Sequence, residues 1–248
     1  MKFNIIIAVD INNGISKDGE IPWKISEDMK YFRRITTDSR LPKAQNAVIM
    51  GRKTCESLPN KYLKNRLNVV LTRNVDYKND KVIKANDFIK ALRICNDNFV
   101  DSIWVIGGKE IYDLAFKSPD LDKIYLTVIN KNFDCDNIVE LPKFKIISTT
   151  SQKLIDSNND EELKILNVIC EPQLNCEHLY LNLLKKIIKN GNKRETRNGT
   201  TISIFSDEIK FNISENFPLL TTKKMFWRGI VEELLFFIRG DTDTKKLG

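Results

Sequence analysis

Strand-like runs alternate with helical patterns over the first 170 residues, and this alternation constrains the fold more than any other feature. Most of the runs are rich in Ile, Val and Leu, and amphipathic stretches of helical length separate several of them. The runs span residues 3–9, 47–50, 67–71, 81–84, 102–106, 123–130 and 163–169, and the helical stretches span residues 27–35, 87–95 and 109–116. This order predicts an α/β fold, with a mainly parallel sheet and flanking helices. The last two runs have no helix between them, which predicts an antiparallel C-terminal edge.

A different pattern begins after residue 170, where a short polar link with a proline precedes a second unit. We expect a first domain over residues 1–170, a linker over 171–176 and a partial α+β segment over 177–248. The link is too short to form a domain of its own, so the two units follow one another closely along the chain.

The second unit begins with an amphipathic helix that ends at Gly191 and is followed by a basic turn. Residues 201–213 alternate like a strand or hairpin, and residues 230–238 form a strongly apolar helix. About 72 residues cannot bury this much apolar surface alone, so the unit is expected to be part of a larger fold.

Composition excludes several classes of protein. The chain has five cysteines without a CxxC pair and a single histidine, His178. An odd cysteine count argues against a disulfide framework, and a reducing, cytoplasmic setting fits best. One histidine almost removes histidine-based metal sites and Ser-His or Cys-His catalysis, so no metal is expected. No run approaches the roughly 20 apolar residues of a membrane span.

The net charge of +7 is scattered and lacks interleaved aromatic residues. A nucleic-acid surface is therefore disfavoured, and anionic small-molecule ligands explain a mildly basic protein at least as well.

Three strand ends have the chemistry of a phosphate site. "AVIMGRKT" places Gly51, Arg52, Lys53 and Thr54 where a strand meets a helix, and "VVLTR" ends with Thr72 and Arg73. "SIWVIGGKEIY" ends with Gly107 and Gly108 before a new helix. A strand-glycine-helix junction alone is more often an ordinary tight turn. Because ligands gather at the carboxyl ends of strands in open α/β sheets, the three together favour a dinucleotide with an extra phosphate, hence NADP over NAD.

Asp28 lies within the apolar stripe Ile25, Met29, Phe32 and Ile35 of the first helix, for which Ser26 is the expected N-cap. A plain explanation is favourable placement near the positive end of the helix dipole. The alternative is an acid or ligand anchor in an apolar pocket walled by Trp23 and Phe32, where burial would raise its pKa. Glu27 points toward solvent in this helical phase.

Five ordered blocks resemble the dihydrofolate reductase family: "IIIAVDINNGISKDGEIPWKISEDMKYF", "VIMGRKTCESLP", "NRLNVVLTR", "WVIGGKEIY" and "IYLTVI". The resemblance covers about residues 1–170. It implies reduction of 7,8-dihydrofolate with NADPH, in which hydride goes to C6 of the pterin and N5 gains a proton. Asp28 would bind the pterin and promote protonation, supported by Thr127, and Arg66 would pair with the α-carboxylate of the substrate.

The resemblance also implies positions around both ligands. The other substrate-binding positions would be the backbone carbonyls of Ile6 and Ile106 and the side chains of Ile21, Phe32, Leu58 and Leu63. Ala8 and Ile15 would line the nicotinamide, and Arg52, Lys53, Thr54, Thr72, Arg73, Gly107, Gly108 and Tyr112 would bind the rest of NADPH.

Four positions depart from the family pattern. Cys55 replaces a usual tryptophan, Asn65 replaces the glycine before Arg66, and Ser16 replaces a loop glycine, which would stiffen the active-site loop. The segment around Asp136 also differs, which puts its contact with that loop in question.

Residues 177–248 resemble the N-terminal part of the thymidylate synthase family. The blocks are "NGNKRETRNGT", "SIFSDEIKFNISENFPLLTTKK", "FWRGIVEELLFFIRGDT" and "KKLG". Arg197 would contact the nucleotide phosphate, and Glu233 would be the catalytic glutamate. The cysteine nucleophile of that family would lie beyond Gly248, so we expect no dUMP methylation by these 248 residues, and a homodimer only through a complete synthase domain.

Two other functions stay open at this stage. One is a reductase of the same fold that acts on another heterocycle, such as a pyrimidine reductase. The other is a non-catalytic protein that keeps only affinity for folate and NADPH.

Overall fold

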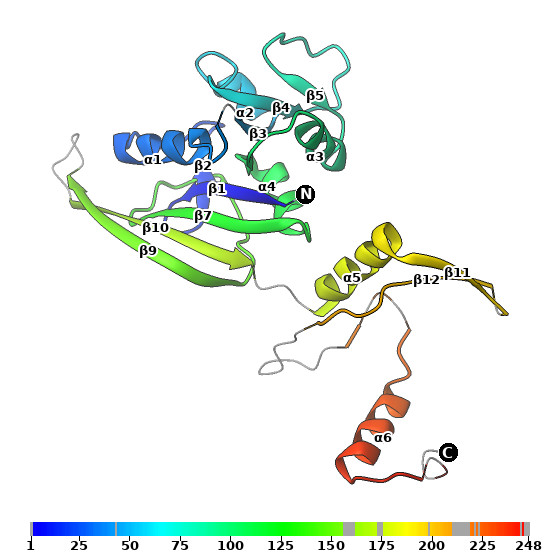
Figure 1. The fold of residues 1–248 in the computed structure, drawn as a ribbon. Coiled ribbons are helices and arrows are strands. Elements are labelled where there is room, and N and C mark those ends of the chain that lie inside the picture. Colours follow the sequence, from blue (N-terminus) through cyan, green and yellow to red (C-terminus); the bar gives the residue numbers. More distant parts are fainter. Residues whose placement is uncertain are drawn as a thin grey trace. The chain divides into compact units, whose positions relative to one another are not determined.

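The computed structural model describes residues 2–42, 44–155, 162–172, 176–197, 199–209, 219–220, 222, 224–243 and 245. The chain divides into two compact units, Met1–Gln173 and Leu174–Gly248 (Figure 1).

The first unit is built on an eight-stranded sheet with the order β5-β4-β3-β6-β1-β7-β10-β9. Its strands are β1 (Phe3–Val9), β3 (Asn46–Gly51), β4 (Arg66–Leu71), β5 (Ile83–Ala85), β6 (Ile103–Val105), β7 (Leu121–Ile129), β9 (Phe144–Ile155) and β10 (Glu162–Pro172). The strands from β5 across to β7 are parallel, whereas β10 pairs antiparallel with both β7 and β9. The mainly parallel sheet with an antiparallel C-terminal edge is therefore confirmed.

Helices cover both faces of this sheet, and the alternation of side chains along β1 shows how. Ile5 and Ile7 pack on one face with residues of α3 (Phe88–Asp97) and α4 (Lys109–Phe116). Ile6 points to the opposite face, where side chains of α1 (Ser26–Thr37) and α2 (Arg52–Ser57) pack. Because successive strand side chains alternate between faces, one strand contributes to both layers of the core.

Two sequence-based expectations for the strands need correction. The edge strand is β9, which the sequence pattern does not reveal, because its centre is polar ("STTSQK") and it pairs with β10 alone. Ile146 and Ile147 are exposed on it, so it lacks the clear alternation of a half-buried strand. The strand expected at residues 81–84 is the shorter β5, shifted toward its C-terminal end.

The start of α1 also differs from the expectation. Ile25 is the N-cap and no side chain caps the helix, whereas the Ser26 hydroxyl donates to the Glu27 carboxylate (2.8 Å). Met29 is 58% exposed and does not belong to the buried stripe. Phe32 and Ile35 do pack on the sheet, so the apolar face is narrower than the pattern predicted.

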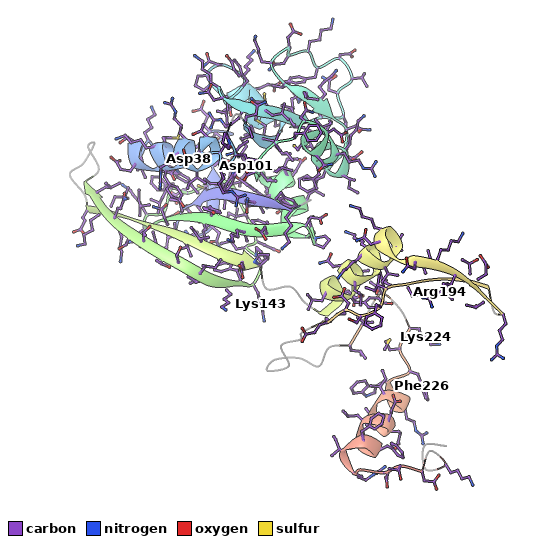
Figure 2. All side chains as sticks on the ribbon, in the orientation of Figure 1. Asp38, Asp101, Lys143, Arg194, Lys224 and Phe226 are labelled. Carbon is purple, nitrogen blue, oxygen red and sulfur yellow. The ribbon has the colours of Figure 1, made fainter. Side chains whose placement is uncertain are left out.

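The segment after α1 is held by polar contacts to neighbouring elements. The buried Asn46 side chain donates to the backbone oxygens of Thr36 (3.1 Å) and Asp38 (2.9 Å). Arg40 donates its backbone N–H to the Asp101 carboxylate (2.9 Å); Figure 2 labels Asp38 and Asp101. These contacts fix the C-terminal end of the helix that carries Asp28.

The second unit contains α5 (Cys176–Asn190), β11 (Asn192–Thr196), β12 (Gly199–Ser203) and α6 (Trp227–Ile238). The basic turn expected after Gly191 is instead β11, which forms an antiparallel hairpin with β12. The end of the alternating stretch, residues 210–213, lies outside the described residues. Phe226, labelled in Figure 2, and Phe237 and Ile238 of α6 are largely exposed.

Among the described residues, no helix combines the length and the hydrophobicity needed to cross a membrane. Within the same residues, no group of three or more His, Cys, Asp and Glu side chains could hold a metal ion.

A buried carboxylate joins two loops beside β1. Asp10 is 1% exposed and accepts hydrogen bonds from the backbone N–H groups of Asn12 (2.9 Å), Gly14 (2.7 Å) and Phe133 (3.2 Å). Burial alone would raise the pKa of Asp10, but these three donors and Cys135 outweigh it, so the pKa lies below its usual value. The ionised carboxylate is therefore part of the folded structure.

We predict that Asp10→Asn lowers the free energy of unfolding by about 1–3 kcal/mol at pH 7, because an amide accepts fewer of these bonds. The contribution of Asp10 is complete above the pKa of the unfolded chain and is lost as the pH falls through its lowered folded pKa. The difference between variant and wild type in urea unfolding should therefore shrink in acid. Asp122→Asn, which removes a surface ion pair with Lys2, is the control and should change stability by less than about 0.5 kcal/mol.

Candidate active site

Strands β1 and β6 separate early at the carboxyl edge of the sheet. They pair only at Asn4↔Trp104 and Ile5↔Val105. Beyond this point β1 continues beside β7 as far as Val9, whereas the chain after β6 turns toward β3: the Ile106 N–H donates to the Ile49 oxygen (3.0 Å). Such a divergence of neighbouring strands is where open α/β sheets bind ligands.

Tyr112 occupies the base of this divergence. Its buried hydroxyl donates to the backbone oxygen of Ile6 (2.9 Å), which joins α4 to β1. Gly107 has a φ of +95°, and a Cβ atom there would lie 2.5 Å from the Tyr112 ring. Only glycine fits this position, because both the backbone conformation and the close approach exclude a side chain.

The expected phosphate segments meet at the same edge. The Gly51 N–H donates to the Gly107 oxygen (2.7 Å), and a Cβ on Gly108 would lie 3.3 Å from the Thr54 hydroxyl. Helices α2 and α4 both begin at glycine N-caps without a side-chain hydrogen bond, at Gly51 and Gly108. Backbone N–H groups at two neighbouring helix starts thus remain available for an anion.

The basic side chains of this edge differ in whether they already have a hydrogen-bond partner, which the sequence does not reveal. Arg52 donates to both oxygens of Glu56 (2.9 Å each), so its guanidinium already has an anionic partner. Lys53 and Arg73 are exposed, and the Thr72 hydroxyl accepts from the Asn74 N–H (3.1 Å).

Asp28, in the first turn of α1, is half-buried and hydrogen-bonds with Thr127 and Trp23. Burial raises the pKa of this carboxyl above its usual value, and hydrogen bonding with Thr127 and Trp23 acts in the opposite direction without cancelling the effect. Its neighbour Glu27 hydrogen-bonds Ser26 and lies 3.9 Å from Lys30, and these contacts lower its pKa. The surroundings of these two adjacent carboxyls thus raise the pKa of Asp28 and lower the pKa of Glu27.

Thr127 is 1% exposed and donates its hydroxyl proton to the side-chain oxygen of Asn167 (2.9 Å). Pattern reasoning missed Asn167, although a signal existed: it is the only amide in the otherwise apolar centre of its strand, "ILNVIC". A polar side chain that is buried in such a run needs a partner, and Thr127 opposite on β7 provides it.

Arg66 is held in place at the start of β4. Its guanidinium donates to the buried Thr36 hydroxyl (2.7 Å) and, through Nε, to the Lys64 oxygen (3.0 Å). Burial and the nearby charge of Arg33 lower its pKa. Asn65 before it has a φ of +62°, a left-handed conformation that explains why asparagine can replace glycine there. Thr36 was also missed as a member of the site.

Cys55, at the position of the family's usual tryptophan, secures the segment before Arg66. Its buried thiol donates to the Lys61 oxygen (3.0 Å) and accepts from the Tyr77 hydroxyl (3.4 Å). Burial raises the pKa of the Cys55 thiol, so it stays protonated and acts as a donor. The partly buried Leu58 and Leu63 flank this segment.

Several apolar side chains of α1 and the neighbouring loops are partly exposed to solvent. Ile21 is 59% exposed, and Met29 beside Asp28 is similarly open, whereas Phe32 is half-buried. Ile106 is buried at the end of β6. Exposed apolar side chains next to a protected carboxylate are typical of a ligand pocket.

The loop after β1 is tied to a second loop. Strand β2 (Gly14–Ser16), which carries the half-buried Ile15, pairs with β8 (Asn137–Ile138), and the Asp18 N–H donates to the Asp136 carboxylate (2.9 Å). Asp136 therefore does contact this loop. The Ser16 hydroxyl accepts from the Asn137 amide (3.0 Å), a bond that glycine could not make. Ala8, half-buried on β1, precedes this loop.

The residues singled out in the second unit lie on its surface. Arg197 is exposed next to the turn of the β11–β12 hairpin, and Glu233 is exposed on α6.

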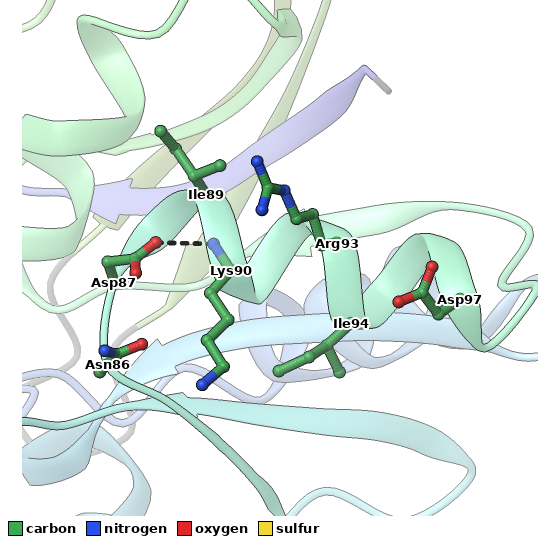
Figure 3. A pocket seen from close by; sticks show the side chains of 7 residues that line it. All are labelled: Asn86, Asp87, Ile89, Lys90, Arg93, Ile94 and Asp97. Carbon is green, nitrogen blue, oxygen red and sulfur yellow. Dashed lines mark hydrogen bonds between the residues drawn. The ribbon is translucent and has the colours of Figure 1, made fainter.

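A surface depression lies along α3 in the first unit (Figure 3). It is lined by Asn86, Asp87, Ile89, Lys90, Arg93, Ile94 and Asp97. Asp87 caps the helix by accepting from the Lys90 N–H (2.7 Å). Because its charged groups are of both signs and none of the expected site residues lines it, it is an ordinary solvated helix face.

The fold and the site define a class: an α/β protein with a nucleotide-suited sheet edge beside a protected carboxylate. Residues 2–169 match the family described as dihydrofolate reductase, and residues 178–248 match thymidylate synthase. Because the first match covers more than half of the sequence, this chain belongs to the dihydrofolate reductase family.

Relatives share both parts. Proteins named bifunctional dihydrofolate reductase-thymidylate synthase from Daucus carota, Paramecium tetraurelia and Leishmania major are 36%, 35% and 34% identical. Each match covers 99% of this chain and 55%, 53% and 54% of the relative, respectively. The chain therefore spans about half the length of these curated relatives.

We predict that Gly107→Ala destabilises the first unit by about 2–4 kcal/mol, because the new Cβ must displace the Tyr112 ring and strain the backbone. Gly19→Ala is the matched control: Gly19 has a similar φ of +83°, but no atom lies within 4 Å of the place that its Cβ would take. It should cost only about 1 kcal/mol in thermal or urea unfolding. Equal costs for both substitutions would show that the approach of Tyr112 is unimportant.

Proposed function

We propose that the first unit reduces 7,8-dihydrofolate to tetrahydrofolate with NADPH, as part of one-carbon metabolism and dTMP synthesis. The observation that carries this proposal is the protected carboxyl of Asp28, with its raised pKa, beside the sheet edge where Gly51, Gly107 and Gly108 meet.

The residues at this edge fit NADPH. Two helix starts without side-chain caps offer N–H donors to its phosphates, and Gly107 and Gly108 let it approach the backbone closely. Lys53, Thr54, Thr72 and Arg73 would add cations and hydroxyls, and Arg52 would share its guanidinium between Glu56 and the cofactor. Ala8 and Ile15 would line the nicotinamide, and Tyr112 would contact the rest of NADPH. NADPH supplies the hydride of the reaction.

The residues of α1 and of the segment before β4 fit a pterin with a carboxylate tail. Asp28 would bind the pterin ring, and the carbonyls of Ile6 and Ile106 would accept from its amino group. The Ile6 oxygen already accepts from Tyr112 and keeps a second lone pair. Ile21, Phe32, Leu58 and Leu63 would cover the aromatic rings.

Arg66 would bind the α-carboxylate of the substrate. Thr36 and the Lys64 oxygen orient its guanidinium from behind and leave donors free for a bidentate pair.

Asp28 would supply the proton by the same physical effect that raises its pKa. A carboxyl with a raised pKa is protonated in a larger fraction of molecules near neutral pH, so it can deliver or relay a proton to N5. A bound pterin ring would cover Asp28, exclude more water from it and raise its pKa further.

We predict that Asp28→Asn lowers turnover by about 100-fold or more at pH 7, because the amide cannot supply a proton. Wild-type turnover should decline as the pH rises through the raised pKa of Asp28, and the variant should lack this decline. The measurement is NADPH oxidation followed by absorbance, with and without dihydrofolate.

Glu27→Gln is the matched control for this experiment, since Glu27 is the adjacent carboxylate on the outer side of the same helix turn. It should retain nearly full turnover. Near-normal turnover of Asp28→Asn would contradict the role of Asp28. Absence of dihydrofolate-dependent oxidation in the wild type would favour a pyrimidine reductase-like activity or a binding protein instead.

We predict that Arg66→Lys raises KM for dihydrofolate by about 10-fold or more and changes kcat little, because an ammonium group cannot make the bidentate pair. Arg40→Lys is the control, since Arg40 is an exposed arginine near Asp101. The measurement is the steady-state rate of both variants at increasing dihydrofolate concentrations, which gives KM and kcat separately. An unchanged KM in Arg66→Lys would contradict a role of Arg66 in substrate binding.

We also propose roles for the second unit in a polypeptide that carries the remaining thymidylate synthase region. Arg197 would contact the phosphate of dUMP and Glu233 would act in the methylation of dUMP to dTMP. Their exposure on the hairpin and on α6 is compatible with a ligand. The exposed apolar side chains of α6 support a role in packing or in homodimer formation by a complete domain.

A cytoplasmic location is proposed because Cys55, Cys95, Cys135 and Cys170 are all free thiols.

A further inference from the structure

A buried amide lies behind the pair formed by Asp28 and Thr127. Asn167 is 9% exposed and sits directly opposite Thr127 in the antiparallel pair of β7 and β10. The Thr127 hydroxyl is 2.9 Å from the Asn167 side-chain oxygen and donates to it. Thr127 thus lies between a carboxyl on α1 and an amide on β10.

The direction of this hydrogen bond limits what Thr127 can do for Asp28. A hydroxyl has one proton and two acceptor lone pairs. In the structure this proton is directed at Asn167, so Asn167 competes with the Asp28 carboxylate for it and weakens the donation that lowers the pKa of Asp28. A weaker donor stabilises the ionised carboxylate less and leaves the protonated form more populated.

The charged and titratable surroundings of Asp28 do not offer another explanation. Trp23 is the remaining hydrogen-bond partner and donates through its indole N–H. Tyr31 on the same helix and Tyr112 from α4 interact electrostatically with Asp28, and burial raises the pKa of both, so both are neutral near pH 7. Among the described residues, no lysine or arginine contributes to the pKa of Asp28.

We propose that Asn167 is a positioning residue for proton delivery: by accepting the Thr127 proton, it turns the hydroxyl so that Asp28 is favoured in its protonated form. Asn167 touches neither ligand and acts through Thr127. The catalytic role of Asn167 rests on the proposed function. Its effect on the protonation of Asp28 can be tested without that function.

Without Asn167, the hydroxyl loses its acceptor and turns to donate to Asp28. This bond stabilises the ionised form, so the pKa of Asp28 falls. A group with a lower pKa carries its proton in a smaller fraction of molecules at neutral pH, and the pH at which turnover declines moves downward by the same amount. The plateau of turnover in acid stays unchanged.

The test is a titration of the Asp28 carboxyl by ¹³C NMR in the full chain without ligands, assigned with Asp28→Asn. We expect Asn167→Leu, which is close in size but apolar, to lower the pKa of Asp28 by about one pH unit. Asn167→Val, a strong strand former, serves as a second variant should Asn167→Leu fail to fold. Asn68→Leu is the control: it removes another buried amide of the same sheet, on β4, and should leave the pKa of Asp28 in place.

A double-mutant cycle with Thr127→Val separates this role from a structural one. In the Thr127→Val background there is no hydroxyl to turn, so Asn167→Leu should have no further effect on Asp28. An unchanged pKa in the folded Asn167 variants, or the same shift without the Thr127 hydroxyl, overturns the proposal.

The pH profile of turnover links the result to activity. A downward shift of about one pH unit, with up to about 10-fold less turnover at neutral pH, is expected in Asn167→Leu. A wild-type chain that binds but does not reduce dihydrofolate would overturn the proposed function, while the NMR titration would still decide the role of Asn167.

Discussion

The early parting of β1 and β6 is the constraint on which the candidate site depends. After two paired residues the strands diverge, and Tyr112 fills the base of the gap by donating to Ile6. A glycine at position 107 is required because the Tyr112 ring lies where its Cβ would be. The Gly51 N–H donates to the Gly107 oxygen and so brings the starts of α2 and α4 together, two helix N-termini of the kind that attract anions.

The second organising feature is the contrast between Asp10 and Asp28. Both carboxyls are shielded from water, yet backbone N–H donors keep the pKa of Asp10 low, while burial raises the pKa of Asp28. Burial opposes ionisation in both, and the number of donors decides the outcome. Asp10 can therefore act as a permanent anion that joins two loops, whereas Asp28 is available for proton exchange. The number of hydrogen-bond donors around each carboxyl thus distinguishes a structural carboxylate from one suited to proton exchange within one domain.

Much of the fold could be predicted from sequence because strand and helix periodicities are local. The parallel sheet, its antiparallel edge and the helices that carry Asp28 and Gly108 follow from such patterns. The polar edge strand β9 could not be predicted, because an edge strand with one neighbour needs no buried alternation. The hairpin strand β11 has the pattern of a turn, since its five residues are exposed and carry no apolar signal. Met29 shows the limit within a helix, where spacing alone assigned a buried position to an exposed side chain.

Residue identity and order alone are enough to establish the family, the order of the elements and the chemical groups available: one acid on an inward helix face, glycines at strand ends and an arginine at the start of β4. These depend on residue identity and spacing along the chain. The partners of those groups, in contrast, follow from the folded arrangement of distant segments. Arg52 is engaged by Glu56, Arg66 is oriented by Thr36, and Thr127 is turned by Asn167 from a strand 40 residues later. The direction of a hydrogen bond and the burial of a carboxyl arise from contacts between distant segments, and these contacts set the pKa of Asp28.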